Sequence, residues 1–326
     1  MVPMEEAHDR FPSTLDAIGR TPLIELQHIS GDHGRILAKL EFLNPGGSKK
    51  DRIALQIIRD AEQSGNLEAG QPVVELTSGN TGAGLAIVCA VTKHPFIAVM
   101  SRGNSQERAM MMRALGANVV LVDQDPMSPS GQVTGVDLDL VEAETRRIVR
   151  EQGAFRANQF ELGANWRSHY IGTGPEIWSA SPGFAAFCDF AGTGGSFAGC
   201  AKYFKEQDHD IACYVVEPES SPALAGRSIR DPRHRIQGGG YSRRSLRMLE
   251  LAQVIPDGFL AVSDAEALEY ARRLGKEEGL FVGISSGANV AAAMKLLAGR
   301  HRHQTVVVLL NDTGLKYLST ELFVSE

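Results

Sequence analysis

Short apolar runs and longer amphipathic segments alternate along this chain. In the first half, PVVEL at 72–76 and PFIAVM at 95–100 are rich in apolar, often β-branched residues, and helical spacing follows, for example at 105–116. Runs of this length are typical of buried strands, and the longer segments are typical of helices. The pattern therefore predicts strands that alternate with helices.

The second half of the chain repeats this order. Apolar runs at 184–190, 211–217 and 305–310 alternate with helical segments that include 264–279 and 288–299. Such alternation is typical of parallel sheets with helices on both faces. We therefore predict an α/β fold of two three-layer domains with mostly parallel sheets.

The polar stretch ANQFELGAN at 157–165 is the predicted boundary between the two units, and we expect a cofactor to bind between them. Two further stretches interrupt the alternation, at 123–135 and 226–244. Both are rich in proline, glycine and charged residues, so we expect long surface loops there.

The composition is that of an ordinary globular protein. With 326 residues, 43% of them apolar, the chain can fill a sizeable core. A net charge of -6 and short, interrupted cationic runs do not favour a nucleic-acid partner. The acidic amino terminus lacks the apolar core of a secretory signal, and no apolar run is long enough to predict a membrane span. We therefore expect a cytoplasmic protein.

The four cysteines lie scattered in apolar contexts. None has the two-residue spacing of a zinc-binding pair, so we expect buried free thiols, a reducing compartment and no metal site. They are Cys89, Cys188, Cys200 and Cys213.

Four loops rich in glycine and small polar residues lie at predicted strand ends and helix starts. They are NPGGSKKDR at 44–52, TSGNTG at 77–82, AGTGGS at 191–196 and GISSGA at 283–288. Four such loops in one chain suggest a single anionic cofactor that is held from several sides.

The AGTGGS loop follows an apolar strand and opens a helix. Its backbone amides and the positive end of the helix dipole can hold a phosphate group. Two other interpretations stay open: a tight turn that binds nothing, and a dinucleotide site in which Gly192 and Gly194 give G-x-G and Glu217 binds a ribose. Against the dinucleotide, Phe197 stands where that fingerprint has its third glycine.

Two lysines, Lys49 and Lys50, end the first loop and begin a helix. A lysine at a helix start is usually solvated, and Lys49 fits that description. An imine-forming lysine must be desolvated or lie near other cations, because only the neutral amine attacks; Lys49 and Arg52 can supply this effect to Lys50. Together with a phosphate loop, such a lysine points to pyridoxal 5'-phosphate (PLP).

The other two loops supply polar groups. TSGNTG is first of all a helix cap with Thr77 or Ser78 at the N-cap, but its amides and hydroxyls can also hold a carboxylate, and the Asn80 amide can bond the phenolic oxygen of PLP. GISSGA is likewise a helix cap, whose hydroxyl can bond the pyridine nitrogen without protonating it. A neutral partner of that nitrogen favours loss of a β leaving group.

Taken in order, these motifs resemble those of the cysteine synthase (O-acetylserine sulfhydrylase) family, which are fold type II, tryptophan synthase β-like PLP enzymes. The resemblance runs from IGRTPLIEL at 18–26 almost to the carboxyl terminus and includes NQF at 158–160 and NDTGLKYLSTELF. It implies a homodimer. It also implies a small mobile domain at 44–162 with the substrate carboxylate loop, and a large phosphate-binding domain at 1–43 and 163–326.

The resemblance also implies roles for individual residues. Lys50 is the Schiff-base lysine and the acid–base group at the substrate α carbon, Asn80 contacts the phenolic oxygen, and Ser285 contacts the pyridine nitrogen. The phosphate is held by Gly192, Thr193, Gly194, Gly195 and Ser196, and the substrate carboxylate by Thr77, Ser78, Asn80, Thr81 and Gln159.

The implied reaction is β-replacement on an O-activated L-serine, either O-acetylserine or O-phosphoserine, through an aminoacrylate intermediate. Sulfide as the nucleophile gives L-cysteine. The alternatives are homocysteine, cyanide or an amino-acid amine as the nucleophile, or a serine or threonine dehydratase. The sequence leaves the leaving group, the nucleophile and docking of a serine acetyltransferase open.

The chain departs from the family pattern at three places. Ser101 and Arg102 replace a proline and an acidic residue, and the segment at 123–135 is longer. If Arg102 or Arg243 faces the pocket, we expect a substrate with an extra negative charge, such as O-phosphoserine or an acidic amino acid; otherwise these are solvated loop charges. The third departure replaces an apolar lip with Tyr241, Arg243 and Arg244.

Overall fold

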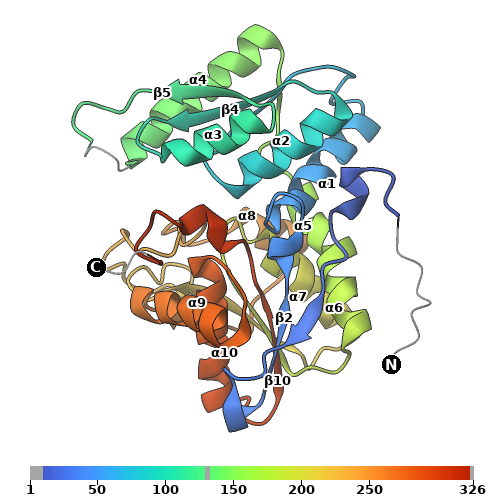
Figure 1. The fold of residues 1–326 in the computed structure, drawn as a ribbon, viewed down its shortest axis with the longest axis vertical. Coiled ribbons are helices and arrows are strands. Elements are labelled where there is room, and N and C mark those ends of the chain that lie inside the picture. Colours follow the sequence, from blue (N-terminus) through green and yellow to red (C-terminus); the bar gives the residue numbers. More distant parts are fainter. Residues whose placement is uncertain (1–9, 129–132, 324–326) are drawn as a thin grey trace.

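The computed structural model describes residues 10–128 and 133–323, so part of the predicted loop at 123–135 and most of the acidic amino terminus lie outside the described residues. The strands form two sheets, one in each of two lobes along the long axis of the molecule (Figure 1).

The larger sheet has the strand order β1-β2-β10-β7-β8-β9. All neighbouring strands in it are parallel except β1, which pairs antiparallel with β2. The strands are β1 (Leu23–Glu25), β2 (Arg35–Lys39), β7 (Ala186–Phe190), β8 (Ala212–Pro218), β9 (Gly258–Val262) and β10 (Thr305–Leu309).

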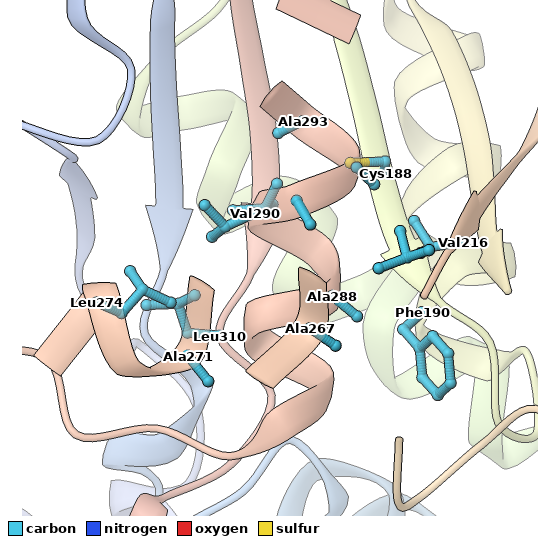
Figure 2. Packing of buried hydrophobic residues seen from close by; sticks show 14 of the residues in the cluster. Cys188, Phe190, Val216, Ala267, Ala271, Leu274, Ala288, Val290, Ala293 and Leu310 are labelled. Carbon is cyan, nitrogen blue, oxygen red and sulfur yellow. The ribbon is translucent and has the colours of Figure 1, made fainter. Parts of the chain in front are cut away.

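Helices cover both faces of this sheet. On one face lie α9 (Asp264–Glu278) and α10 (Ile284–Ala298), and on the other α6 (Gly174–Ala180), α7 (Gly195–Gln207) and α8 (Arg247–Ala252). Alternate residues of each strand therefore enter different cores: in β7, Cys188 packs toward α10 and Phe187 toward α7. Figure 2 shows Cys188 and Phe190 of β7 and Val216 of β8 beside the small residues of α10.

The smaller sheet is parallel, with the order β5-β4-β3-β6. In β4, Ala98 and Met100 pack with α1, α2 and α3, whereas Ile97 and Val99 pack with α4. The strands are β3 (Val73–Leu76), β4 (Phe96–Ser101), β5 (Asn118–Val122) and β6 (Phe155–Arg156). The helices are α1 (Lys50–Gln63), α2 (Asn80–Thr92), α3 (Gln106–Ala114) and α4 (Gly135–Gln152).

Short helical segments connect these layers. A π-helical segment, η4 (His169–Thr173), joins α5 (Ala164–Ser168) to α6. The 3-10 segments are η1 (Thr14–Ala17), η2 (Gly31–His33), η3 (Glu41–Leu43) and η5 (Gly314–Tyr317).

The predicted α/β fold of two three-layer units with mostly parallel sheets is confirmed. The long loop predicted at 226–244 lies between β8 and α8, where no helix or strand is formed. All four cysteines are buried free thiols. The domain limits at 44–162, 1–43 and 163–326 stay predictions, although the smaller sheet falls within the first of these ranges. Among the described helices, none has the length and apolar character that a bilayer crossing requires.

The loops singled out by the sequence meet where the two lobes join, and α1 lies at this junction (Figure 1). In parallel sheets, the carboxyl ends of strands share one edge, so the loops after β7 and β10 come together there. The GISSGA loop is brought in by close packing of α10 on α9: a Cβ added at Gly287 would lie 2.1 Å from the Ala267 carbonyl oxygen. Only glycine permits this approach.

Candidate active site

Lys50 is the first residue of α1 and its side chain is partly buried at the junction of the lobes. Among the described residues, no hydrogen bond or ion pair of its ammonium group is found. The pKa of Lys50 is lowered to about 7, first by desolvation and then by the charge of Lys49, while Asp189 and Asp312 act in the opposite direction. An amine with this pKa is substantially neutral at physiological pH, as imine formation requires.

Lys49 is not the solvated lysine that the sequence predicts. It is buried, and its ammonium lies 3.0 and 2.9 Å from the two carboxylate oxygens of Asp189, a fully buried residue of β7. The prediction was wrong because an acidic partner 140 residues away accepts the charge. Its effect on Lys50 was predicted correctly.

Arg52 does not contribute to lowering the pKa of Lys50, contrary to the prediction. Its guanidinium is engaged by two carboxylates: Glu41, at 2.8 Å, and Glu176, at 2.7 Å. Lys39 also pairs with Glu176, through Oε2 at 2.7 Å. This largely buried cluster joins α1 to the large sheet and to α6, so Arg52 fixes the start of the Lys50 helix.

The GTGGS loop connects β7 to α7. Gly194, the N-cap of α7, has a φ of 84°, a left-handed conformation that favours glycine. No protein acceptor among the described residues is found for the backbone amides of Gly192, Thr193 and Gly194. Unpaired amides at the start of a 13-residue helix form a suitable phosphate site.

The hydroxyl of Ser196 donates to Asp189 Oδ2 at 2.5 Å. Asn289, on α10, donates to Asp189 Oδ1 at 3.1 Å. Together with Lys49, these contacts connect the NPGGSKKDR segment, the AGTGGS segment and the helix that GISSGA opens through one buried carboxylate.

The structure does not support a dinucleotide site. The Glu217 carboxylate accepts from the backbone amides of Leu224 and Ala225 at 2.9 and 3.0 Å, so it is used to fix the following turn. Phe197, at the position of the missing third glycine, is fully buried and stacks on Phe187.

The TSGNTG segment runs into α2, which begins at Asn80. The N-cap is Gly79, not Thr77 or Ser78, but the Thr77 hydroxyl still caps the helix because it accepts from the amide of Gly82 at 3.0 Å. The Thr81 hydroxyl donates to Gln159 Oε1 at 2.6 Å. The predicted carboxylate loop and the NQF glutamine are therefore in direct contact.

The side chain of Asn80 is held at both ends. Its amide nitrogen donates to Asp312 at 2.7 Å, and its oxygen accepts from Lys316 at 2.6 Å. Lys316 also donates to the carbonyl of Gly46 in the NPGGSKKDR segment. The segment after β10 thus connects two of the four loops.

Ser285 lies in the first turn of α10, and its oxygen accepts from Asn311 at 3.1 Å. A hydroxyl that accepts this bond keeps its own proton for another acceptor. Asn165 completes the connections: its amide donates to Thr193 in the phosphate loop at 2.9 Å and to the carbonyl of Gln159 at 2.7 Å.

The structure adds residues for which the sequence predicted no role. Asp189 interrupts an apolar run, and a charge within a buried strand is a signal that identifies it. Asp312 and Lys316 belong to the NDTGLKYLSTELF motif, which the resemblance includes without a role for either. Asn165 ends the polar stretch at 157–165 and Asn289 lies in a predicted helix, and no local pattern marks either as a site residue.

Two of the unusual arginines have other partners. Arg102 pairs with Asp123 at 2.5 Å and its side chain is 57% exposed. Arg243 is exposed, and its guanidinium carbon lies 5.2 Å from the ring centroid of Phe160, the residue after Gln159. Arg243 therefore lies near the NQF motif, whereas Arg102 forms an ion pair at the surface.

The residues present fit PLP: a partly desolvated lysine, an amide cradle for a phosphate and a neutral hydroxyl on a helix turn. Comparison with known proteins agrees. The family model "Pyridoxal-phosphate dependent enzyme" matches residues 14–312. A cysteine synthase of Staphylococcus aureus is 37% identical over 94% of this chain and 95% of the relative.

Solved structures give the same result. A structure of O-ureido-L-serine synthase superimposes with a TM-score of 0.86 at 36% identity, covering 97% of both chains. An O-acetylserine sulfhydrylase, isoform 3 of Entamoeba histolytica, has a TM-score of 0.88 at 31% identity, covering 100% of this chain and 96% of that one. The chain therefore belongs to the pyridoxal-phosphate dependent enzymes, within the fold type II cysteine synthase family, and PLP is its cofactor.

Proposed function

We propose that this protein catalyses β-replacement on an O-activated L-serine with sulfide to give L-cysteine, and that Lys50 carries the PLP. The observation that supports this most directly is the environment of Lys50, whose amine has a pKa of about 7. It interacts with the charges of both Asp189, next to the phosphate loop, and Asp312, which holds Asn80.

The remaining site residues have distinct roles in this proposal. The amides of Gly192, Thr193, Gly194 and Gly195 and the hydroxyl of Ser196 hold the phosphate, Asn80 contacts the phenolic oxygen, and Ser285 bonds the pyridine nitrogen. The substrate carboxylate is bound by the loop residues Thr77, Ser78, Asn80 and Thr81 together with Gln159. The bond between Thr81 and Gln159 supports this set, because it places two of its members side by side.

When bound, PLP supplies an electron sink that stabilises negative charge at the substrate α carbon. Neutral Lys50 removes the α proton and returns it at the end of the reaction. The carboxylate loop orients the substrate so that this proton faces the Lys50 amine. Asn80 is oriented in advance by Asp312 and Lys316, which reduces the cost of ordering it during binding. Ser285 donates a hydrogen bond without supplying a full proton.

The cysteine synthase relatives favour sulfide as the nucleophile, whereas the name of O-ureido-L-serine synthase points to another nucleophile on the same fold. The test is to offer sulfide, homocysteine and hydroxyurea separately to the enzyme with O-acetylserine or O-phosphoserine and to measure the products. Sulfide should give the highest kcat/KM. A protein that is colourless and unresponsive to PLP, or that makes no cysteine with either donor, would contradict the proposal.

The proposal includes a homodimer in the cytoplasm, because the resemblance implies a dimer and the four buried free cysteines fit a reducing compartment. Light scattering should give about twice the chain mass of 35.2 kDa. A monomer at micromolar concentration, or activity outside the cytoplasmic fraction, would contradict these two points.

A further inference from the structure

The ion pair between Lys49 and Asp189 lies next to the proposed phosphate site. Asp189 is fully buried and Lys49 is 7% exposed. Asp189 Oδ2 accepts from both the Lys49 ammonium, at 2.9 Å, and the Ser196 hydroxyl, at 2.5 Å. A phosphate bonded to Ser196 would thus lie only two hydrogen bonds away from a buried carboxylate.

Such a carboxylate opposes phosphate binding in two ways. Its negative charge repels the phosphate in a poorly screened environment. It also competes for the single hydroxyl proton of Ser196, which can be donated either to Asp189 or to the phosphate but not to both. The Asn289 amide, which donates to Asp189 at 3.1 Å, brings no charge that could offset the repulsion.

We propose that Lys49 is a positioning residue for cofactor binding: it neutralises Asp189 and so frees the Ser196 hydroxyl to donate to the PLP phosphate. The ammonium contacts both carboxylate oxygens, at 3.0 and 2.9 Å, and this makes the carboxylate a weaker acceptor for Ser196. Lys49 acts through Asp189 and Ser196 and is distinct from Lys50, which carries the cofactor. The inference rests on the proposed phosphate site.

A purely structural ion pair is the alternative, since Lys49 precedes α1 and Asp189 lies in the large sheet. The two explanations predict different effects of Asp189→Asn on phosphate affinity. If the pair only stabilises the fold, Asp189→Asn lowers the stability of the protein and does not increase its affinity for phosphate. If Lys49 acts by neutralising Asp189, then Asp189→Asn removes the repulsion, and cofactor affinity is kept or increased even without Lys49.

The experiment compares wild type, Lys49→Met, Asp189→Asn and the double variant. The dissociation constants of PLP and of inorganic phosphate are measured on each apoprotein, together with its melting temperature. We expect Lys49→Met to lower the affinity for both ligands by about tenfold or more, because it leaves the buried carboxylate without its cationic partner. Asp189→Asn should bind both at least as tightly as wild type, and the double variant should be within about threefold of wild type.

Wild-type affinity in Lys49→Met, or a double variant as weak as Lys49→Met, would overturn the inference. If Lys49→Met does not fold, the phosphate affinity of Asp189→Asn tests the inference alone. Weaker phosphate binding by Asp189→Asn than by wild type would overturn it, because removing the carboxylate charge should not weaken binding. Failure of the proposed function is separate: wild-type protein would then bind neither PLP nor phosphate, whatever the variants do.

Discussion

The side-chain nitrogen of Asn80 donates to Asp312 Oδ2 at 2.7 Å, and this bond joins the first turn of α2 to the segment after β10. The hydroxyl of Tyr317 donates to the same oxygen at 2.7 Å. The other oxygen, Oδ1, is buried and accepts from no described group. A residue proposed to contact the cofactor is thus oriented by a carboxylate from the other lobe.

Replacing Asp312 by alanine should therefore affect both stability and activity. The Asn80 amide and the Tyr317 hydroxyl lose their acceptor, which should lower the free energy of unfolding by about 1–3 kcal/mol, measured by urea denaturation. Since Asn80 then keeps only its bond from Lys316, kcat/KM should fall by about tenfold. Tyr317→Phe is the matched control and should lose about 1 kcal/mol with kcat/KM nearly unchanged. An equal loss of activity in both variants would argue against an orienting role.

The amine of Lys50 should react with PLP at unusually low pH. Only the neutral amine attacks, so the rate at which apoprotein acquires visible absorbance should be half-maximal near the Lys50 pKa of about 7 and nearly constant at higher pH. An ordinary lysine would give a rate that rises toward pH ~10.4. Lys50→Ala should stay colourless but folded. A rate that continues to rise beyond pH ~9 would show that the amine is not desolvated.

Glu75, a buried residue of β3, should make the protein less stable as the pH rises. Burial raises its pKa from 4.5 to about 8, while Arg156 acts in the opposite direction. Between pH ~4 and pH ~8 the folded state keeps a proton on Glu75 that the unfolded state loses. The contribution of Glu75 to the free energy of unfolding is therefore fully present below pH ~4 and is lost as the pH rises to ~8.

Glu75→Gln removes this titration. At pH 8 the variant should be more stable than wild type by about 1–3 kcal/mol, and at pH 4.5 the two should be nearly equal, as measured by urea unfolding. Glu277→Gln, at a surface position paired with Arg273, is the control and should show no such trend. If Glu75→Gln is less stable at pH 8, the carboxylate is ionised and paired in the folded state.

Arg52 should be among the residues most important for stability. Substitution by methionine leaves Glu41, which is fully buried, without its cationic partner. We expect a loss of about 3–5 kcal/mol, whereas breaking the surface pair of Arg146 and Glu142 should cost less than about 1 kcal/mol. Urea unfolding of Arg52→Met and Arg146→Met gives the comparison, and similar losses would mean that the buried cluster contributes no more than a surface pair.

The sequence identified the fold and the four loops because both depend on local pattern. Strand and helix periodicity, and glycines before helices, are properties of neighbouring residues. It did not identify what neutralises Lys49 or what holds Asn80, because Asp189 and Asp312 lie 140 and 232 residues away from their partners. For the same reason Arg52, which is close to Lys50 in the chain, was assigned an effect that Glu41 and Glu176 prevent.

The last prediction concerns the donor substrate and separates two arginines that the sequence could not distinguish. Arg243 lies over the ring of Phe160 and lines a cavity together with Gly192 of the phosphate loop. Arg102 instead pairs with Asp123 at the surface. If a donor phosphate is recognised, Arg243 is therefore the better placed cation.

Arg243→Ala should lower kcat/KM for O-phosphoserine relative to O-acetylserine by about tenfold, because a charge-assisted contact is lost only with the charged donor. Arg102→Ala, the matched control, should leave this ratio unchanged. The measurement is kcat/KM for each donor at fixed sulfide and at two salt concentrations, since a direct contact is screened less than a general surface field. If the ratio in Arg243→Ala equals that of wild type, Arg243 does not bind the donor phosphate. It is then a solvated surface charge, and its charge does not distinguish O-phosphoserine from O-acetylserine.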